Sequence, residues 1–155
     1  MPSSTDFQIR QLTADNADQV GPWLDMFGKA FEAPEDYCHA QPSLAYRKKL
    51  LSNPAFIALA AYVDDRVVGG LAAYELMKFE QERSEIYIYD LAVDDAFRRR
   101  GMATALIGAL KRIARDRGAS IIYVQADHGD DPAIALYTTL GEREDVMHFD
   151  IPVGD

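Results

Sequence analysis

Two long apolar runs near the middle of the chain, residues 56–63 and 67–76, constrain the fold most, because only three polar residues separate them. That connection is Asp64-Asp65-Arg66, and so short a polar break between two such runs predicts a β-hairpin. The strands of a hairpin pair antiparallel, so the runs predict a sheet that is at least partly antiparallel.

Strand and helix patterns alternate on both sides of this hairpin. The predicted elements are a strand at residues 7–12, a helix at 20–31, a loop at 32–42, a short helix at 43–51, a strand at 85–93, a helix of about fifteen residues that Gly118 ends, a strand at 120–126, a short helix at 132–140 and a last strand at 146–151. A chain of 155 residues has the length of one domain. We therefore expect a single mixed α/β domain over residues 1–155.

The charge is acidic overall and unevenly distributed. The net charge of −9 argues against nucleic acid and against an anionic membrane surface as partners. Residues 98–117 carry seven basic side chains and one acid, a net charge of +6, so the rest of the chain carries −15. This division suggests one anionic and one cationic ligand. The alternative is a solvated basic helix face.

The single cysteine, Cys38, excludes an internal disulfide framework and favours a reducing compartment. Residues 1–10 lack the apolar core of a signal peptide, and no apolar run approaches the roughly 20 residues of a membrane span. We therefore expect a cytoplasmic protein. His39, His128 and His148 show no metal-ligand spacing, so no metal is expected.

The segment Arg98-Arg99-Arg100-Gly101 lies between a predicted strand and a predicted helix. The first turn of a helix has backbone N–H groups without partners and a partial positive charge. A glycine there lets an anion approach the backbone, and three arginines add charge, which predicts a phosphate or pyrophosphate site. The alternative is a helix start with solvated arginines. The segment is not a P-loop, because it lacks Gly-Lys-Ser/Thr.

The motif Arg98-x-x-Gly101-x-Ala103 resembles the acetyl-CoA signature of the GNAT superfamily of N-acetyltransferases. The order of elements is similar along almost the whole chain. Four stretches (residues 56–61, 84–93, 123–141 and 146–150) resemble more narrowly the aminoglycoside 3-N-acetyltransferases of the gentamicin-resistance type, whereas residues 1–51 match them more loosely. The resemblance implies a mixed, mostly antiparallel sheet that is splayed at the acetyl-CoA site and has helices on both faces.

The function that the resemblance implies is transfer of an acetyl group from acetyl-CoA to the 3-amino group of a deoxystreptamine ring, which confers antibiotic resistance. The pantetheine arm would pair with the strand end and the pyrophosphate would lie on the helix start. The cofactor-binding residues implied are Leu91, Ala92, Val93, Arg98, Arg99, Arg100, Gly101, Met102, Ala103 and Thr104.

The resemblance implies Tyr137 as the general acid for the leaving thiolate, although a tyrosine packed in the core is the alternative. The attacking ammonium group must also lose a proton to a carboxylate. Asp90 is the most interesting candidate, because it directly precedes the residues implied for pantetheine binding. The alternative is a structural carboxylate that stabilises a bulge or accepts a loop N–H. The sequence does not identify which carboxylate is the general base; the candidates are Asp90, Glu85, Asp127, Asp130 and Asp131.

Three acids in the loop Asp127-His128-Gly129-Asp130-Asp131 are more than a helix cap requires, and carboxylates bind the ammonium groups of a cationic aminoglycoside. The candidate substrate-binding residues are Glu85, Tyr87, Asp127, His128, Asp130, Asp131 and Asp150. Two alternatives stay open: a transferase for another polycation, such as a polyamine or a basic peptide, and a non-catalytic CoA-binding module. Relatives of this kind are often dimers, so the resemblance also allows a homodimer.

Overall fold

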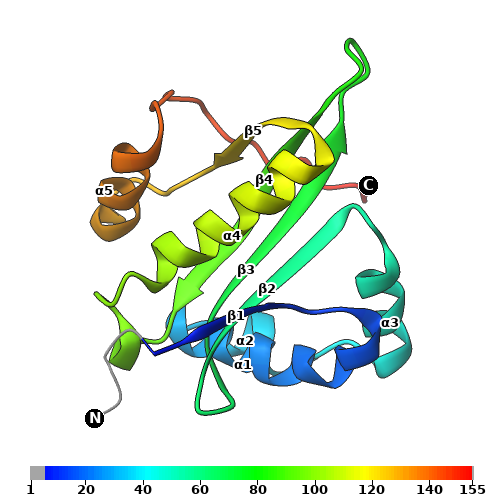
Figure 1. Ribbon diagram of the computed structural model, residues 1–155, viewed down its shortest axis with the longest axis vertical. Helices are drawn as coiled ribbons and strands as arrows, with labels where there is room; N and C mark the ends of the chain where they lie inside the picture. The colour runs from blue at the N-terminus through cyan, green and yellow to red at the C-terminus, as the bar shows by residue number, and fades with distance from the viewer. Residues whose placement is uncertain (1–5, 155) are drawn as a thin grey trace. The chain divides into compact units, whose positions relative to one another are not determined.

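The computed structural model describes residues 6–154 (Figure 1), and the chain divides into two compact units, residues 1–125 and 126–155. The first unit contains a five-stranded sheet in the order β1-β2-β3-β4-β5. Its strands are β1 (Gln8–Gln11), β2 (Phe56–Val63), β3 (Arg66–Met77), β4 (Ser84–Val93) and β5 (Ala119–Val124). The first three pairings are antiparallel and the last is parallel, which confirms the mixed, mostly antiparallel sheet.

The central hairpin forms as predicted from residues 56–76. Val63 pairs with Arg66, so the turn consists of Asp64 and Asp65. Both aspartates have a positive φ, of 48° and 63°, which is the backbone conformation that a two-residue hairpin turn requires. Aspartate tolerates this conformation better than most residues, so the sequence specifies the turn locally.

Helices cover both faces of this sheet, as two adjacent glycines of β3 demonstrate. A Cβ atom on Gly70 would lie 2.5 Å from Nε1 of Trp23 in α1 (Val20–Ala30). A Cβ atom on Gly69 would lie 3.0 Å from Sδ of Met102 in α4 (Met102–Arg117). Since adjacent strand residues point to opposite faces, α1 and α4 lie on opposite sides of the sheet.

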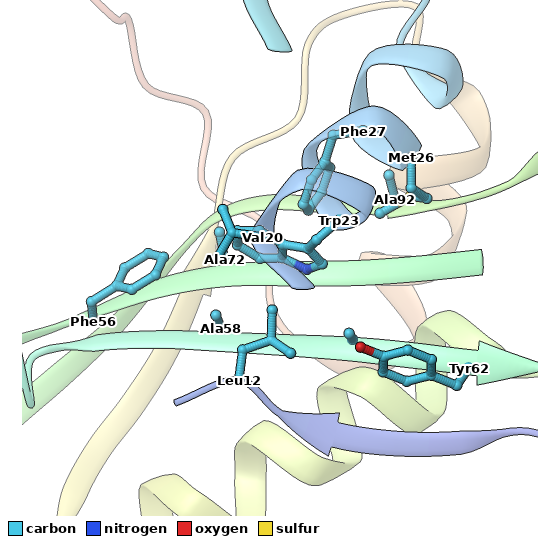
Figure 2. Packing of buried hydrophobic residues seen from close by; sticks show 11 residues of the cluster. Leu12, Val20, Trp23, Met26, Phe27, Phe56, Ala58, Tyr62, Ala72 and Ala92 are labelled. Carbon is cyan, nitrogen blue, oxygen red and sulfur yellow. The ribbon is translucent and has the colours of Figure 1, made fainter. Parts of the chain in front are cut away.

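The α1 side of the sheet holds a large apolar cluster (Figure 2). Val20, Trp23 and Phe27 point from α1 onto Ala58 and Ala72 of the sheet. The indole N–H of Trp23 donates to the carbonyl oxygen of Leu59 at 2.9 Å, so this buried polar group is satisfied.

The segments that flank α1 are more helical than the sequence predicted. A 3₁₀ helix, η1 (Ala14–Gln19), precedes α1, and a four-residue helix, α2 (Pro34–Tyr37), lies in the segment expected to be a loop. Pro34 begins α2, and a proline is suited to a first helical turn because it lacks an N–H group. The helix α3 (Leu44–Ser52) begins at the predicted cap, where Oγ of Ser43 accepts from the Tyr46 N–H at 3.2 Å.

The second unit contains one helix, α5 (Asp131–Leu140), within its described residues 126–154. Asp130 caps it by accepting the N–H of Ala133 at 3.4 Å. The prediction of a strand at residues 146–151 is wrong: these residues form no strand, and Met147, Phe149 and Ile151 are exposed. Alternation of side chains provides one apolar face, but a strand also needs backbone partners.

Three expectations lie outside what these observations test. The interpretation of residues 1–10 falls partly on residues 1–5, outside the described part of the chain. The single domain over residues 1–155 and the cytoplasmic location stay predictions. Among residues 6–154, no helix combines the length and the apolar character needed to cross a bilayer.

Candidate active site

The strand β4 pairs with β5 along only its first half. The pairs run from Ser84 to Ile88, whose partner is Val124, and within the described residues no partner from β5 follows. On its other edge β4 stays paired with β3 as far as Val93. The sheet is therefore open beside residues 89–93, where the backbone of β4 can pair with an extended ligand.

A β-bulge lies at the point where the sheet opens. Ile88 pairs with Ala73, but Asp90 pairs with the adjacent residue Ala72, so Tyr89 is the extra residue. Ala72 belongs to the apolar cluster beneath α1. The bulge therefore turns Asp90 to the α1 face of the sheet, whereas unbroken alternation would have placed it on the same face as Ile88.

Asp90 is a half-buried carboxylate beside this opening. Its Oδ2 atom accepts a hydrogen bond of 2.9 Å from the hydroxyl of Tyr37, at the end of α2. Burial raises the pKa of Asp90 and outweighs the lowering effect of that hydrogen bond. A carboxylate with a raised pKa is a better proton acceptor near neutral pH.

Tyrosines from three strands cover the sheet next to Asp90. The rings of Tyr87 and Tyr123 stack with centroids 4.8 Å apart, and Tyr89 contacts Tyr87 and Tyr74 edge-on at 5.9 and 6.0 Å. The hydroxyl of Tyr87 donates to Oε1 of Gln125 at 2.7 Å. Tyr89 is 64% exposed, so part of this tyrosine surface faces solvent. An aromatic face next to a carboxylate attracts ammonium groups.

The basic segment forms a tight turn between η2 (Asp95–Phe97) and α4. Arg99 and Gly101 both have a positive φ, of 64° and 76°, and a Cβ atom on Gly101 would have no neighbour within 4 Å. The first intrahelical bond is donated by the N–H of Ala105, so the amides of residues 102–104 are not used within the helix. This turn can therefore hold an anion such as a pyrophosphate.

Two of the three arginines also have partners within the turn. Arg98 forms a 2.9 Å ion pair with Asp95, and its Nε donates to the carbonyl oxygen of Val93 at 3.3 Å. The guanidinium of Arg100 lies 5.0 Å from the centre of the Phe97 ring. These contacts hold the basic turn against the end of β4.

The other candidates occupy different places. Glu85, near the start of β4, forms a 3.0 Å ion pair with Lys78. In the second unit Asp130 caps α5, Asp131 lies in its first turn, and Asp150 contacts His148 at 2.8 Å. Tyr137 is half-buried on α5, and Asp127 and His128 are exposed in the loop before that helix. Their roles stay predictions.

Sequence reasoning missed Tyr37 and Tyr74 as neighbours of Asp90, and Tyr123 as the stacking partner of Tyr87. Tyr37 is 53 residues away from Asp90 in the chain. Its only local signal is that it is an aromatic residue in a segment rich in proline and acids. The other two tyrosines were interpreted only as strand residues.

Comparison with known proteins gives two kinds of similarity. Residues 22–141 match the Acetyltransferase (GNAT) family. A mycothiol acetyltransferase from Clavibacter michiganensis is 31% identical over 147 residues, which cover 92% of this chain and 44% of that relative. An uncharacterized N-acetyltransferase from Methanocaldococcus jannaschii is 28% identical, with 89% of this chain and 61% of the relative covered. The chain thus spans about half the length of these curated relatives.

Two solved structures match along their whole length. One is an aminoglycoside acetyltransferase from an uncultured soil metagenomic sample, with 54% identity, a TM-score of 0.94 and coverage of 96% of this chain and 99% of that one. The other, also an aminoglycoside acetyltransferase from soil metagenomic material, is in complex with sisomicin; it has 29% identity, a TM-score of 0.88 and coverage of 96% and 97%.

The fold and these matches agree. The mixed sheet, open beside the second half of β4, and the glycine turn before α4 are the features that the signature motif implied. The family match extends over both of them. The chain therefore belongs to the GNAT family of acetyltransferases, enzymes that use acetyl-CoA.

Proposed function

We propose that this protein transfers the acetyl group of acetyl-CoA to an amino group of an aminoglycoside, and that the 3-amino group of the deoxystreptamine ring is the acceptor. The observation that carries the proposal is Asp90, a half-buried carboxylate between the open end of β4 and an exposed tyrosine surface. The 54% identity with a protein described as an aminoglycoside acetyltransferase supports the substrate class. The ring position rests on the resemblance of the sequence.

Acetyl-CoA would bind as the anionic substrate. Its pantetheine arm would pair with the free backbone edge at Leu91, Ala92 and Val93, which extends the sheet by one strand-like segment. Its pyrophosphate would lie on the amides of residues 99–104, where the helix dipole and the arginines favour negative charge. This arrangement would bring the thioester to the end of β4 that carries Asp90.

The reaction would proceed by direct attack. Asp90 accepts a proton from the ammonium group, directly or through one water, and the free amine attacks the thioester carbonyl. The new C–N bond forms, the C–S bond breaks, and an N–H group near Ala92 or Val93 stabilises the oxyanion between these events. The thiolate leaves and is protonated to CoA, with Tyr137 as the proposed donor. The nitrogen loses its second proton as the amide forms, and that proton restores the tyrosine hydroxyl through solvent.

The acceptor would bind through charge and aromatic contact. Its ammonium groups would meet Asp90 and the exposed ring of Tyr89. The acids of the 127–131 loop stay candidate substrate contacts on the sequence alone. Acetylation would remove one of those positive charges. A rigid polycationic ring system binds such a tyrosine surface at a lower entropic cost than a linear polyamine does, because it loses less conformational freedom on binding.

The decisive experiment measures free-thiol release from acetyl-CoA with gentamicin, spermidine and a basic peptide as acceptors. We expect turnover with gentamicin, and NMR of the product should locate the acetyl group on the 3-amino nitrogen. Asp90→Asn should lower kcat by about 100-fold, the scale of general-base catalysis. Asp116→Asn, an exposed carboxylate on α4, is the matched control and should leave kcat unchanged.

Other outcomes would redirect the assignment. Turnover with spermidine or the peptide alone would make the protein an acetyltransferase for another polycation. Binding of CoA without turnover on any amine would contradict the proposal and favour a non-catalytic module. An unchanged kcat in Asp90→Asn would remove Asp90 from the mechanism while leaving the reaction in place.

A further inference from the structure

We infer that Tyr37 is a positioning residue for Asp90: its hydroxyl fixes the orientation of the carboxylate through Oδ2 and leaves Oδ1 for the amine. The hydrogen bond between them is 2.9 Å long and joins α2 to β4 across 53 residues of sequence. The inference rests on the proposed function for its kinetic consequence. The contact itself is a property of the first unit alone.

The ring of Tyr37 is held by aromatic neighbours rather than by its hydroxyl. It stacks on Phe27 of α1 at 5.9 Å and contacts Phe31 at 5.7 Å. The side chain of Tyr37 packs against the apolar cluster beneath α1. The ring therefore has a fixed place at the edge of the core, and its hydroxyl is presented to Asp90 at little further entropic cost.

The backbone of Tyr37 is also held in place. A Cβ atom on Gly28 of α1 would lie 2.5 Å from Sγ of Cys38 and 3.3 Å from Cβ of Tyr37, so α2 packs directly on that glycine. Nε2 of Gln41 donates to the carbonyl oxygen of Tyr37 at 3.2 Å and to Asp25 at 2.8 Å. Such support from a second layer of contacts is what holds a reacting group in its productive geometry.

The groups that face Asp90 are aromatic. They are Tyr37 from α2, Tyr74 from β3, and Tyr87 and Tyr89 from β4 itself, while Asp36 acts on Tyr37 from within α2. Within residues 6–154, Asp90 forms no ion pair, and Tyr37 is the side chain that donates to it. Burial beside Asp90 raises the pKa of the Tyr37 hydroxyl, which therefore stays protonated and able to donate. Removing that hydroxyl should raise the pKa of Asp90 further.

The test compares Tyr37→Phe with Tyr62→Phe. Phenylalanine keeps the ring in both variants, with its stacking on Phe27 at position 37 and with the guanidinium of Arg10 4.5 Å from the ring centre at position 62. Tyr62 is a matched control, because its hydroxyl donates at 2.9 Å to a neutral amide, Oε1 of Gln19, rather than to a carboxylate. The ¹³C resonance of the Asp90 carboxyl group, followed against pH in the free protein, reports its titration without any need for turnover.

We expect Tyr37→Phe to raise the midpoint of the Asp90 titration by about one pH unit, the scale of a lost hydrogen bond to a charged group. The acidic limb of kcat/KM should move upward with it, so that activity falls about tenfold below the limb and changes little above it. Tyr62→Phe should move neither. In an Asp90→Asn background, Tyr37→Phe should have no further effect on kcat.

An Asp90 titration in Tyr37→Phe that superimposes on that of the wild-type protein would overturn the inference. A loss of activity that is equal at every pH would also overturn it, because that is the result of a merely structural role. Failure of the proposed function looks different: the wild-type protein would then turn over no aminoglycoside, while the carboxyl titration would still respond to Tyr37→Phe.

Discussion

Two aspartates at the open end of β4 have opposite pKa shifts, and their hydrogen bonds explain the difference. Asp90 accepts one hydrogen bond, from the hydroxyl of Tyr37, and the effect of burial exceeds it, so that its pKa is raised. Asp94 is also buried, but it accepts the N–H of Ala96 at 3.0 Å and contacts Nζ of Lys29 at 3.1 Å. Burial raises its pKa, and these partners together outweigh burial, so the net shift is downward.

We expect the negative charge on Asp94 to stabilise the folded protein at neutral pH and to lose this effect in acid. A carboxylate with a depressed folded pKa contributes stability above its unfolded pKa of about 3.9 and loses it as the pH falls through the folded pKa. Asp94→Asn should therefore be less stable than wild type at pH 7, with a difference that shrinks as the pH falls below about 4. Urea midpoints at pH 7, 5 and 3 measure it.

Asp94→Ala provides the control, because asparagine can still cap η2 and alanine cannot. Alanine should cost about 1 kcal/mol more than asparagine, and that part should persist at low pH. A difference between wild type and Asp94→Asn that grows on acidification would contradict the depressed pKa.

At the scale of helices and strands, the packing of α2 on α1 depends on one glycine, Gly28. A side chain at Gly28 would collide with Cys38 and displace the helix that carries Tyr37. We expect Gly28→Ala to lower the free energy of unfolding by about 1–3 kcal/mol despite the better helix propensity of alanine. Thermal or urea unfolding measures the change.

Gly108 is the matched control, since it lies inside α4 and a Cβ atom there would have no neighbour within 4 Å. Gly108→Ala should stabilise the protein by about 0.5–1 kcal/mol, because only the backbone entropy of the unfolded chain changes. Equal effects of the two substitutions would show that the contact between α1 and α2 is not tight.

Elements whose signals are local could be predicted from the sequence. Asp64-Asp65 specified the hairpin turn, Ser43 began α3, and Gly118 ended α4 with a φ of 74°. The strand expected at residues 146–151 failed, because pairing depends on a partner that alternation does not reveal. The short helix α2 was missed, since four residues carry no helical period.

The same distinction between local and long-range signals applies to the candidate active site. The glycine turn before α4 follows from a continuous motif, so its position was readable. The contact between Tyr37 and Asp90 joins residues 53 positions apart, and the bulge that makes it available depends on the pairing with β3. No local pattern encodes either fact.

At the scale of the whole molecule, charge separates the two expected substrates. Residues 98–117 carry +6 within a chain whose net charge is −9. An acidic protein attracts a polycation over distances of about 8–10 Å at ordinary ionic strength, and salt shortens this range. The basic turn provides the local exception that an anionic substrate needs.

We therefore expect KM for gentamicin to rise steadily as KCl is increased from 50 to 500 mM, while kcat changes little. Steady-state kinetics at saturating acetyl-CoA measure this, and a series with sodium chloride separates screening from a specific effect of potassium. A KM that does not vary with salt would mean that contacts other than charge hold the aminoglycoside.

The bulge at Tyr89 divides β4 into two parts. In the second part, the even-numbered residues point to the face of the sheet to which the odd-numbered residues point in the first. Before it, Ile86 and Ile88 lie in the interior, and after it Asp90 and Ala92 lie on the α1 face. The even-numbered side chains therefore change face at Tyr89. It follows that Tyr89 is an insertion into an otherwise regular strand. Deleting it would remove the bulge and the exposed ring but would leave Asp90 opposite Ala72 on the α1 face, whereas adding one more residue beside it would turn the carboxylate to the opposite face.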